Sequence, residues 1–344
     1  MKKQVIVVCS VMLTVILRVQ AFAIETINNA DYINSGYHTK VAEAEYAYLK
    51  SEKKRAYDTL QKIEKTIPII GYVTMQWFVE LSLFYENYPK AYKYIYKMID
   101  HYGFKISDFE KYKNFKKLKK KKFYNADTLM RIENDFVADT ALWQQINEMS
   151  EHDQYCRIFW GNECYDTNKS EDDSLCCLYY MEQMIFTDSI NYYKLLDIIE
   201  KKGYPLSKNI KYSRSQGQDV YWALSTLTIH MADVPSYVEK MKSILLEYIR
   251  NGDCYPDILA ELIDKNCILY GRPLVYGQLG YEEIYDIQNL DKRRTAIGLP
   301  PKKLICEILK LQVMQHPIPP ELLKTLPQAI QDSIKDDLNT PCDF

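Results

Sequence analysis

The sequence predicts a mainly α-helical protein, with stacked helical hairpins in its N-terminal part and a helical domain carrying one small β-hairpin in its C-terminal part. Three observations support this fold class. Apolar residues recur at helical spacing through most of the 344 residues. One helical motif recurs further along the chain. The helical pattern is interrupted at residues 268–287, where two β-favouring runs flank Gly277-Gln278-Leu279-Gly280 and predict a hairpin.

The composition is that of an ordinary globular protein, with 47% hydrophobic and 26% charged residues. The chain is long enough for two domains and a substantial core. A formal net charge of −2 argues against nucleic acid as a general partner. The sequence contains 30 tyrosines but only 11 glycines. Tyrosine combines an apolar ring with a hydroxyl group, so this composition suits helix packing and interfaces.

Residues 1–23 have the features of a secretory signal peptide. Two lysines precede an apolar run over residues 5–17, and Ala21 and Ala23 provide the small side chains of a cleavage site. The apolar run of 13 residues is too short to span a bilayer comfortably. We expect cleavage after Ala23, no membrane span afterwards, and an exported protein in the periplasm or the medium. An uncleaved anchor is the alternative.

Removal of the signal peptide leaves eight cysteines, an even number that permits disulfide bonds in an exported chain. They are Cys156, Cys164, Cys176, Cys177, Cys254, Cys267, Cys306 and Cys342. Cys156 with Cys164 and Cys254 with Cys267 are the closest plausible pairs, but the spacing leaves the connectivity open. The sequence has no C-x-x-C or H-E-x-x-H motif, so no metal ion or other cofactor is expected.

Residues 24–36 are predicted to form a linker and residues 37–124 a module of helical hairpins. In this module K-R-A-Y-D-T-L-Q-K-I recurs as P-K-A-Y-K-Y-I-Y-K-M, which places Ala56 and Ala91 35 residues apart. The interval is close to the tetratricopeptide period of about 34 residues, and the module resembles tetratricopeptide-like repeats. The resemblance implies a concave surface for peptides or partner proteins. A purely structural spacer is the alternative.

A lysine-rich run follows the second repeat, with six lysines in residues 116–122. Such a run could bind nucleic acid or an anionic envelope surface. A solvated helix face is the favoured interpretation, because Phe115, Leu118 and Phe123 are interleaved with the lysines and can pack. We place the end of the module near residue 124.

Residues 125–300 are predicted to form the second domain, and residues 301–344 the C-terminal helices. The expected helices of the second domain are Asn125–Arg157, Ser189–Lys202, Gln218–Met231 and two more around Val238–Tyr248 and Ile258–Ile263. A loop is expected over residues 158–174. Asp188 is expected to cap the start of the second of these helices. His230 flanks the apolar stripe of the third.

A series of short motifs runs through this second domain. They are Asp153-Gln154-x-x-Arg157, Asp188-x-x-Asn191, Gly203-x-Pro205, His230, Ala260-x-x-x-Asp264, Gly271 followed by Tyr276-Gly277, and Asp291-x-x-Arg294-x-x-x-Gly298-Leu299. In this order they resemble a family of uncharacterised bacterial domains of unknown function. The resemblance covers roughly residues 125–299. It implies a helical domain that often follows a signal peptide or tetratricopeptide-like segment, and it implies no activity.

The chain departs from that family at three places. Members have Asp-Arg after the last core helix, a Gln two residues before Tyr-Gly, and Thr-Gln after it. This chain has Asp264-Lys265, Leu274 and Gln278-Leu279 there. The loss of a planar guanidinium and two amides would weaken bidentate recognition. If the family site is enzymatic, this member is altered or inactive.

Several motif residues are candidates for a functional site. The candidate catalytic residues are His230, Asp153 and Asp264, and the candidate binding residues are Gln154, Arg157, Tyr276, Gln278 and Arg294. In a shared pocket, the histidine would act as general base, a carboxylate would orient it, and Arg294 would bind an anion. The structural alternatives are a hydrogen-bonded core histidine and an arginine pair that anchors the hairpin through Asp264 or Asp286.

We therefore expect an interaction protein of the bacterial envelope that binds a protein or peptide partner. The binding surface would be the concave groove of the repeats, the corner formed by the predicted β-hairpin, or both. The alternative is an envelope hydrolase that uses His230 with an aspartate and Arg294. Convergence of His230, Asp153, Tyr276 and Arg294 on one cleft would favour the enzyme, and their dispersal would favour the binding protein. The sequence contains no serine elbow or phosphate-binding glycine loop.

Overall fold

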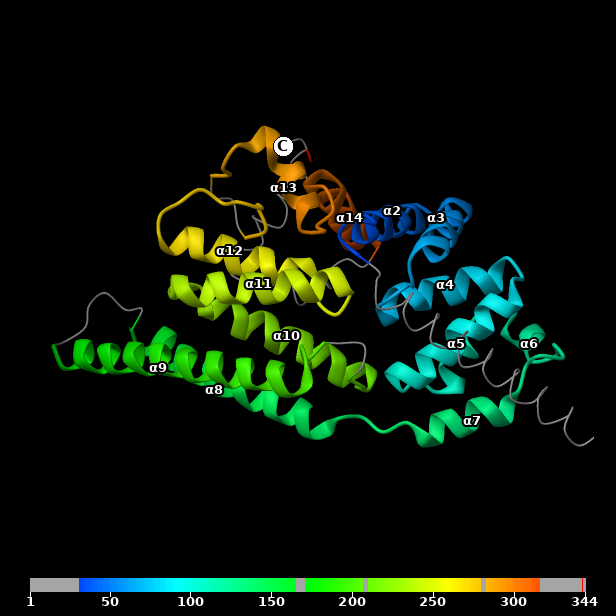
Figure 1. Cartoon of the computed structure of the whole chain (residues 1–344), viewed down its shortest axis with the longest axis horizontal. Helices are drawn as coiled ribbons and strands as arrows, with labels where there is room; N and C mark the ends of the chain where they lie inside the picture. The colour runs from blue at the N-terminus through cyan, green and yellow to red at the C-terminus, as the bar shows by residue number, and fades with distance from the viewer. Residues whose placement is uncertain (1–30, 165–170, 207–209, 280–282, 316–341, 343–344) are drawn as a thin grey trace, which may run out of the picture.

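The computed structural model describes residues 31–164, 171–206, 210–279, 283–315 and 342 (Figure 1). This part of the chain consists of α-helices, short 3₁₀ helices and turns, so the predicted mainly α fold class is confirmed. Among the described residues, no helix is both long and apolar enough to cross a membrane. The predicted signal peptide, most of the predicted linker and most of the predicted C-terminal helices after residue 315 lie outside the described residues.

The N-terminal module consists of helical hairpins that stack on one another (Figure 1). Its helices are α2 (Tyr37–Leu49), α3 (Lys53–Thr66), α4 (Tyr72–Phe84), α5 (Tyr88–Tyr102), η1 (Ile106–Phe109) and α6 (Phe115–Leu118). The next helix, α7 (Ala126–Asp135), follows the predicted boundary at residue 124 and packs beside them. α2 packs on α3, α3 on α4, α4 on α5, and α7 on α5. Helical hairpins are therefore present, and their relation to tetratricopeptide-like repeats remains a prediction.

The repeated alanines lie at the contacts between these helices. Ala56 in α3 and Ala91 in α5 are completely buried. Leu60 and Ile95, one turn further along the same two helices, are buried beside them. A methyl group at such a contact allows close approach of two helix axes, whereas a larger side chain would hold the helices apart. The recurrence in the sequence therefore marks equivalent packing positions.

The C-terminal domain is a bundle of longer helices. They are α8 (Thr140–Cys164), α9 (Glu171–Lys202), α10 (Arg214–His230), η2 (Met231–Asp233), α11 (Pro235–Asn251), α12 (Pro256–Leu269), η3 (Ile287–Asn289), α13 (Leu290–Ala296) and α14 (Lys302–Gln315). α10 contacts α8, α9 and α12, so it is central to the bundle. Val220, Leu224 and Leu227 of α10 are buried, as the predicted apolar stripe requires.

The structure corrects the predicted helix Asn125–Arg157, which is two helices. α7 ends at Asp135 and α8 begins at Thr140. Oδ1 of Asp139 accepts a hydrogen bond of 2.9 Å from the backbone N–H of Leu142, which caps the start of α8. Phe136 follows α7, and its ring occupies the space beside Gly103 that a side chain there would need.

Two further boundaries are corrected in the same region. The loop predicted at residues 158–174 is largely helical, because α8 continues to Cys164 and α9 already begins at Glu171. Asp188 consequently lies inside α9 and does not cap the start of a helix. α8 and α9 pack against each other, and such tertiary packing overrides the low helix propensity of the Gly, Asn and Asp residues in the predicted loop.

The hairpin predicted at residues 268–287 is not formed by the described residues, which contain no β-strand in this interval. α12 continues to Leu269, and only an isolated bridge joins Leu274 to Ile284. The backbone N–H of Leu274 donates to the carbonyl of Glu283 at 2.7 Å. The backbone N–H groups of Val275 and Tyr276, which follow, donate to the side chain of Asp264 and not to a neighbouring strand. A buried carboxylate thus replaces the hydrogen bonds expected from a second strand.

The N- and C-terminal parts pack directly against each other. α14 returns to the first hairpin and packs on α2 (Figure 1). Nε2 of Gln312 in α14 donates to Oε1 of Glu45 in α2 at 2.8 Å. On the other side, Nζ of Lys211 lies 2.8 Å from Oδ1 of Asp100 in α5. Contacts from well-separated parts of the sequence therefore hold the N-terminal module on the C-terminal bundle.

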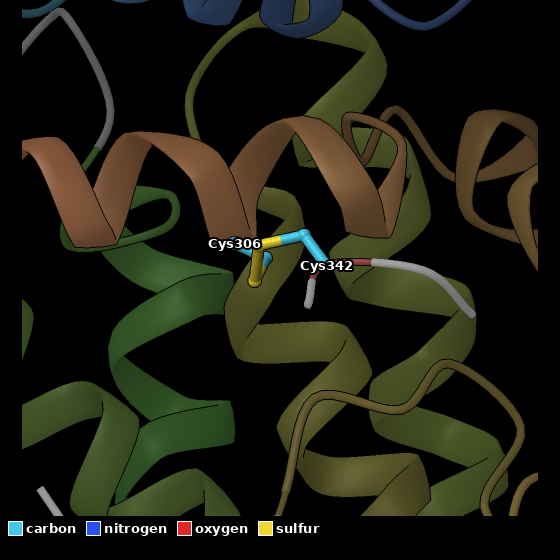
Figure 2. The surroundings of a disulfide bond; sticks show 2 residues. All are labelled: Cys306 and Cys342. Carbon is cyan, nitrogen blue, oxygen red and sulfur yellow. A yellow bond between two sulfur atoms is a disulfide. The ribbon is translucent and has the colours of Figure 1, made fainter. Parts of the chain in front are cut away.

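A disulfide bond joins Cys306 in α14 to Cys342 (Figure 2). The two cysteines are 36 residues apart in the sequence. Closing a loop of this length restricts the unfolded chain and stabilises the folded state by about 4 kcal/mol. Cys177 is also disulfide-bonded. The predicted disulfide bonding in the C-terminal part is thus present.

Both of the closest plausible cysteine pairs are wrong. Cys156, Cys254 and Cys267 are free thiols, so neither Cys156 with Cys164 nor Cys254 with Cys267 is bonded. Cys254 precedes α12 and Cys267 lies near its end, and a helix rises about 1.5 Å per residue. Helix α12 therefore holds apart two thiols that are close only in sequence.

Candidate functional site

The first group of candidate residues lies where α8, α9 and α10 pack together. α8 carries Asp153 and Arg157 one turn apart, α9 carries Asp188, and α10 ends with His230. The exposed fraction of the side chain is 0% for Asp153 and 8% for Asp188, but 18% for His230 and 23% for Arg157. The two aspartates are therefore buried, whereas His230 and Arg157 are partly exposed to solvent. We call these four residues the acid–base cluster.

Each carboxylate of the acid–base cluster has a basic partner. Oδ2 of Asp153 lies 2.7 Å from Nδ1 of His230 and also accepts a hydrogen bond of 2.7 Å from the amide of Gln154. Arg157 bridges the two acids, because its Nη2 donates to Asp188 at 2.5 Å and to Oδ1 of Asp153 at 3.4 Å. The predicted pairing of Asp153 with Arg157 exists, but as part of a buried network.

The two carboxylates respond differently to this environment. Burial acts to raise the pKa of Asp153, but the hydrogen bond and charge of His230 and the charge of Arg157 outweigh it and lower the pKa to about 2. Burial raises the pKa of Asp188 to about 7, against the hydrogen bond and charge of Arg157, and the neighbouring Asp153 adds to the increase. Asp153 is therefore ionised at neutral pH, and Asp188 titrates near neutrality.

The ionised Asp153 determines the tautomer of His230. In the neutral imidazole, Nδ1 carries the proton that is donated to the carboxylate, and Nε2 is then the acceptor. A histidine oriented in this way can serve as a general base.

Ligand atoms of Asp153, Asp188 and His230 lie within 4.8 Å of one another, close enough for one metal ion. Arg157 already bonds to both carboxylates, so its guanidinium provides the positive charge that a cation would supply.

The second group of candidates surrounds Asp264 of α12, whose side chain is completely buried. Its Oδ1 accepts hydrogen bonds from the backbone N–H groups of Val275 and Tyr276, both at 2.9 Å. Its Oδ2 accepts one of 2.6 Å from the backbone of Gln278. These three hydrogen bonds engage both oxygens of the carboxylate, and they hold the segment that follows α12 against the helix. Asp264 is thus an anchor for this segment and does not orient His230.

Arg294 of α13 belongs to the same group and is also completely buried. Its guanidinium donates to the carbonyl oxygens of Pro300 at 2.8 Å and Tyr276 at 2.7 Å, and to Oε1 of Gln278 at 3.4 Å. Burial lowers the pKa of Arg294, and the charges of Asp291 and Asp264 oppose this change. Internal acceptors therefore occupy the side chain that was a candidate for binding an anion.

The neighbouring Arg293 forms one of the ion pairs expected under the structural alternative. Its Nη1 lies 3.6 Å from Oδ2 of Asp286, and its Nε donates to the carbonyl of Val275 at 3.0 Å. It also donates to the carbonyl of Tyr285. The arginine pair thus anchors the segment predicted as a hairpin, through one ion pair and several backbone carbonyls.

The candidate residues divide between these two groups. The first group holds His230, Asp153, Gln154 and Arg157, and the second holds Asp264, Tyr276, Gln278 and Arg294. Between the described residues, no hydrogen bond or ion pair links one group to the other. Direct contacts therefore do not join His230 and Asp153 to Tyr276 and Arg294.

Asp188 is the residue of the acid–base cluster that the sequence pattern misassigned. Asp188 and Asn191 are three positions apart in α9, and both are buried. Nδ2 of Asn191 donates to the backbone carbonyl of Met149 in α8 at 3.3 Å. Two polar residues one turn apart on the inner face of a helix could have identified this contact, since such residues need partners on a neighbouring helix.

Large apolar side chains are exposed along the outer sides of α8 and α9. We call this surface the hairpin face. It consists of Tyr155, Ile158, Leu178, Tyr179, Met181, Ile185, Phe186, Ile190 and Tyr193, each of which is at least 36% exposed. In Figure 1 these two helices form the elongated end of the molecule opposite α6. Sequence patterning alone did not single out this surface, because apolar residues at helical spacing are the usual sign of a core.

No protein family, curated protein or solved structure was found to match this chain.

We predict that Asp264→Ala lowers the free energy of unfolding by about 3 kcal/mol or more. The substitution leaves three inner backbone N–H groups without their acceptor, and each such loss costs about 1–3 kcal/mol. Urea denaturation followed by circular dichroism measures the change. The control is Asp197→Ala, which removes an exposed carboxylate paired only with Lys201. We expect an effect of about 0.5 kcal/mol or less for the control, and equal effects of the two substitutions would contradict the anchoring role.

A second prediction concerns the titration of Asp188. Its pKa is raised in the folded state, so its stabilising contribution is fully present below its unfolded pKa and is lost as pH rises through about 7. Asp188→Asn cannot titrate. The unfolding free energy of the wild type, minus that of the variant, should therefore fall by about 1 kcal/mol or more between about pH 4 and pH 7.

Denaturation curves at several pH values measure this difference. Asp197→Asn is the matched control, because its carboxylate is largely exposed. The difference between the wild type and this control should stay nearly constant over the same pH range. A relative gain of wild-type stability with rising pH would show that Asp188 is ionised and stabilising in the folded protein.

Proposed function

We propose that this chain is an exported interaction protein that binds a protein or peptide partner through the hairpin face of α8 and α9. The observation that carries this proposal is the concentration of nine exposed, large apolar side chains on these two helices. Large exposed apolar surfaces are unusual on soluble monomers and mark interaction sites, so the gathering of these side chains on two packed helices supports a binding role. The signal peptide, the tetratricopeptide-like nature of the N-terminal module and the resemblance to a bacterial domain family form part of the same proposal.

The exposed side chains of α9 share one side of the helix. Tyr179, Phe186 and Tyr193 recur every seven residues and therefore form a stripe along α9. The buried residues of α9 lie on its opposite side, where Asp188 and Leu195 face the bundle. Because the inner face is already packed, the stripe is a second apolar face that the described bundle does not cover. Three aromatic rings in such a stripe are suitable anchors for a partner.

Charged residues at the hairpin face favour a partner with a basic rim. Glu148 and Glu151 are exposed on α8, and Glu182 is exposed within the apolar side of α9. Lys194 is exposed beside Tyr193 at one end. The acidic excess complements an apolar segment flanked by lysine or arginine, and opposite charges at the rim increase specificity and the rate of association.

The hairpin face supports binding better than the corner around Tyr276. Tyr276 is only 8% exposed, and its backbone N–H and carbonyl bond to Asp264 and Arg294. The backbone N–H of Gln278 likewise donates to Asp264. These residues complete an internal network, whereas the rings of Phe186 and Tyr193 are 62% exposed. Binding through the corner would require breaking that network.

We predict that Ile185→Ser combined with Phe186→Ser weakens partner binding at least about tenfold, because two apolar anchors are lost. Envelope proteins retained by immobilised wild-type and variant protein are identified and their affinities measured. The control is Val137→Ser combined with Met314→Ser, which replaces exposed apolar residues elsewhere. Both variants should fold, since all four positions are exposed. Equal retention by wild type and both variants would place the binding site outside the hairpin face.

The acid–base cluster supports a second candidate function, an envelope hydrolase. The specific observation is the 2.7 Å contact between His230 and the buried Asp153, which orients the imidazole with Nε2 as acceptor. Asp153 rather than Asp264 would be the orienting acid, since Asp264 bonds to three backbone donors. Arg294 is in the other group, so Arg157 is the cationic residue beside the histidine.

If the protein is a hydrolase, we predict that His230→Ala lowers turnover by about 100-fold or more, the usual contribution of a general base. The substrate is whichever ester, amide or glycoside the wild type hydrolyses. Chromogenic substrates of these three classes measure turnover. His152→Ala is the control, because His152 is an exposed histidine of α8 outside the cluster. Turnover that is equal in wild type and His230→Ala would remove the enzymatic candidate, and partner retention would be unaffected by either substitution.

A further inference from the structure

The lysine-rich segment 111–123 forms a basic surface on the N-terminal module. It contains eight lysines and no acidic residue, and we call it the lysine patch. We propose that the lysine patch docks the protein on a bilayer surface that contains anionic phospholipids. The proposal concerns a surface separate from the hairpin face, so it does not depend on the proposed partner binding.

The interior side of the segment determines where its lysines point. Phe115 and Leu118 of α6 are almost completely buried. The ring of Phe115 packs near Phe109 and Tyr124, with centroid distances of 6.3 and 6.4 Å. These apolar contacts pin a compact turn to the core of the module. Lysines between and after them are consequently held on the outside, and all eight are exposed.

The lysine patch keeps most of its positive charge. Lys117 pairs with Glu86 at 2.7 Å and Lys119 with Glu110 at 2.6 Å. Within the described part of the chain, no carboxylate pairs with the other six, which are Lys111, Lys113, Lys116, Lys120, Lys121 and Lys122. Six ammonium groups without an ion pair among the described residues lie on one short segment of a chain whose net charge is −2. Ion pairing within the protein therefore does not explain this segment.

Aromatic rings next to these lysines favour a lipid interface. Phe123 is 43% exposed at the end of the segment, and Phe84 is 39% exposed. Lys113 lies over the ring of Phe84, with Nζ 5.6 Å from its centroid. Lysines attract anionic headgroups, while exposed aromatic rings enter the boundary between headgroups and acyl chains. A fully solvated helix face would gain nothing from exposing these rings.

Lipid is favoured over nucleic acid by the kind of basic group present. All eight cations are lysines, whereas base recognition and phosphate clamping favour the planar fork of arginine. Lysines on flexible stems suit a diffuse surface of many anionic headgroups. In Figure 1 the lysine patch around α6 and the hairpin of α8 and α9 lie at opposite ends of the long axis. Docking through the patch would leave the hairpin face accessible.

Co-sedimentation of the purified chain, without its predicted signal peptide, with lipid vesicles tests the proposal. One set of vesicles contains phosphatidylcholine with about one third phosphatidylglycerol, and the other contains phosphatidylcholine alone. We expect binding to the first set only, and weaker binding when salt rises from about 0.1 M to about 0.5 M, because salt screens surface charge. Equal binding to both sets would overturn the proposal.

The variant Lys116→Gln, Lys120→Gln, Lys122→Gln removes three unpaired charges of the patch. Each lysine near an anionic bilayer contributes about fivefold to binding, so the triple variant should bind about 100-fold more weakly. The control Lys65→Gln, Lys240→Gln, Lys292→Gln removes the same charge from exposed positions elsewhere. It should bind like the wild type. Equal loss in both triple variants would overturn the patch as the docking surface.

A fluorescent single-stranded oligonucleotide provides the remaining comparison. Binding that depends on the three patch lysines, together with no binding to anionic vesicles, would overturn the lipid assignment and identify nucleic acid as the ligand. Failure of vesicle binding leaves the hairpin face untouched, since the patch variant retains Phe186 and Tyr193. Partner retention by the patch variant therefore separates failure of this inference from failure of the proposed function.

Discussion

The packing of α8, α9 and α10 depends on the compensation of the buried acids Asp153 and Asp188. Neither side chain is exposed enough for water to solvate its charge, and an uncompensated buried charge costs several kcal/mol. Arg157 bonds to both acids and His230 to one of them. A shift of α9 by one residue would remove Asp188 from Arg157. The cluster thus selects one register of the helices, and that register places the apolar stripe of α9 on the outside.

The corner around Asp264 follows the same rule with backbone groups as partners. A carboxylate on α12 accepts three hydrogen bonds from the following segment, and Arg294 donates to two carbonyls near it. An aspartate and an arginine close in space suggest catalysis or anion binding when only their types are known. Here their hydrogen bonds are directed inward, and their role is to hold an irregular segment in place.

The surfaces proposed for interaction lie outside both networks. The hairpin face is exposed because the opposite side of α9 supplies the contacts to the bundle, and the lysine patch is exposed because Phe115 and Leu118 anchor its inner side. In each case the buried contacts of an element determine which residues remain for a partner. The two surfaces have different chemistry, one apolar with an acidic rim and one basic with aromatic rings, and they suit different partners.

The sequence by itself determined the helical fold class and the buried side of helices such as α10, because that information lies in residues three or four positions apart. The stripe of α10 was predictable for this reason, whereas Ala56 and Ala91 were marked by their recurrence 35 residues apart. Only the tertiary structure decided which polar groups meet. His230 and Asp153 are 77 residues apart in the sequence and join because α8 and α10 pack. Asp188 was misassigned as a cap, and residues 268–287 as a hairpin, because their hydrogen-bond partners come from elements that local spacing does not specify.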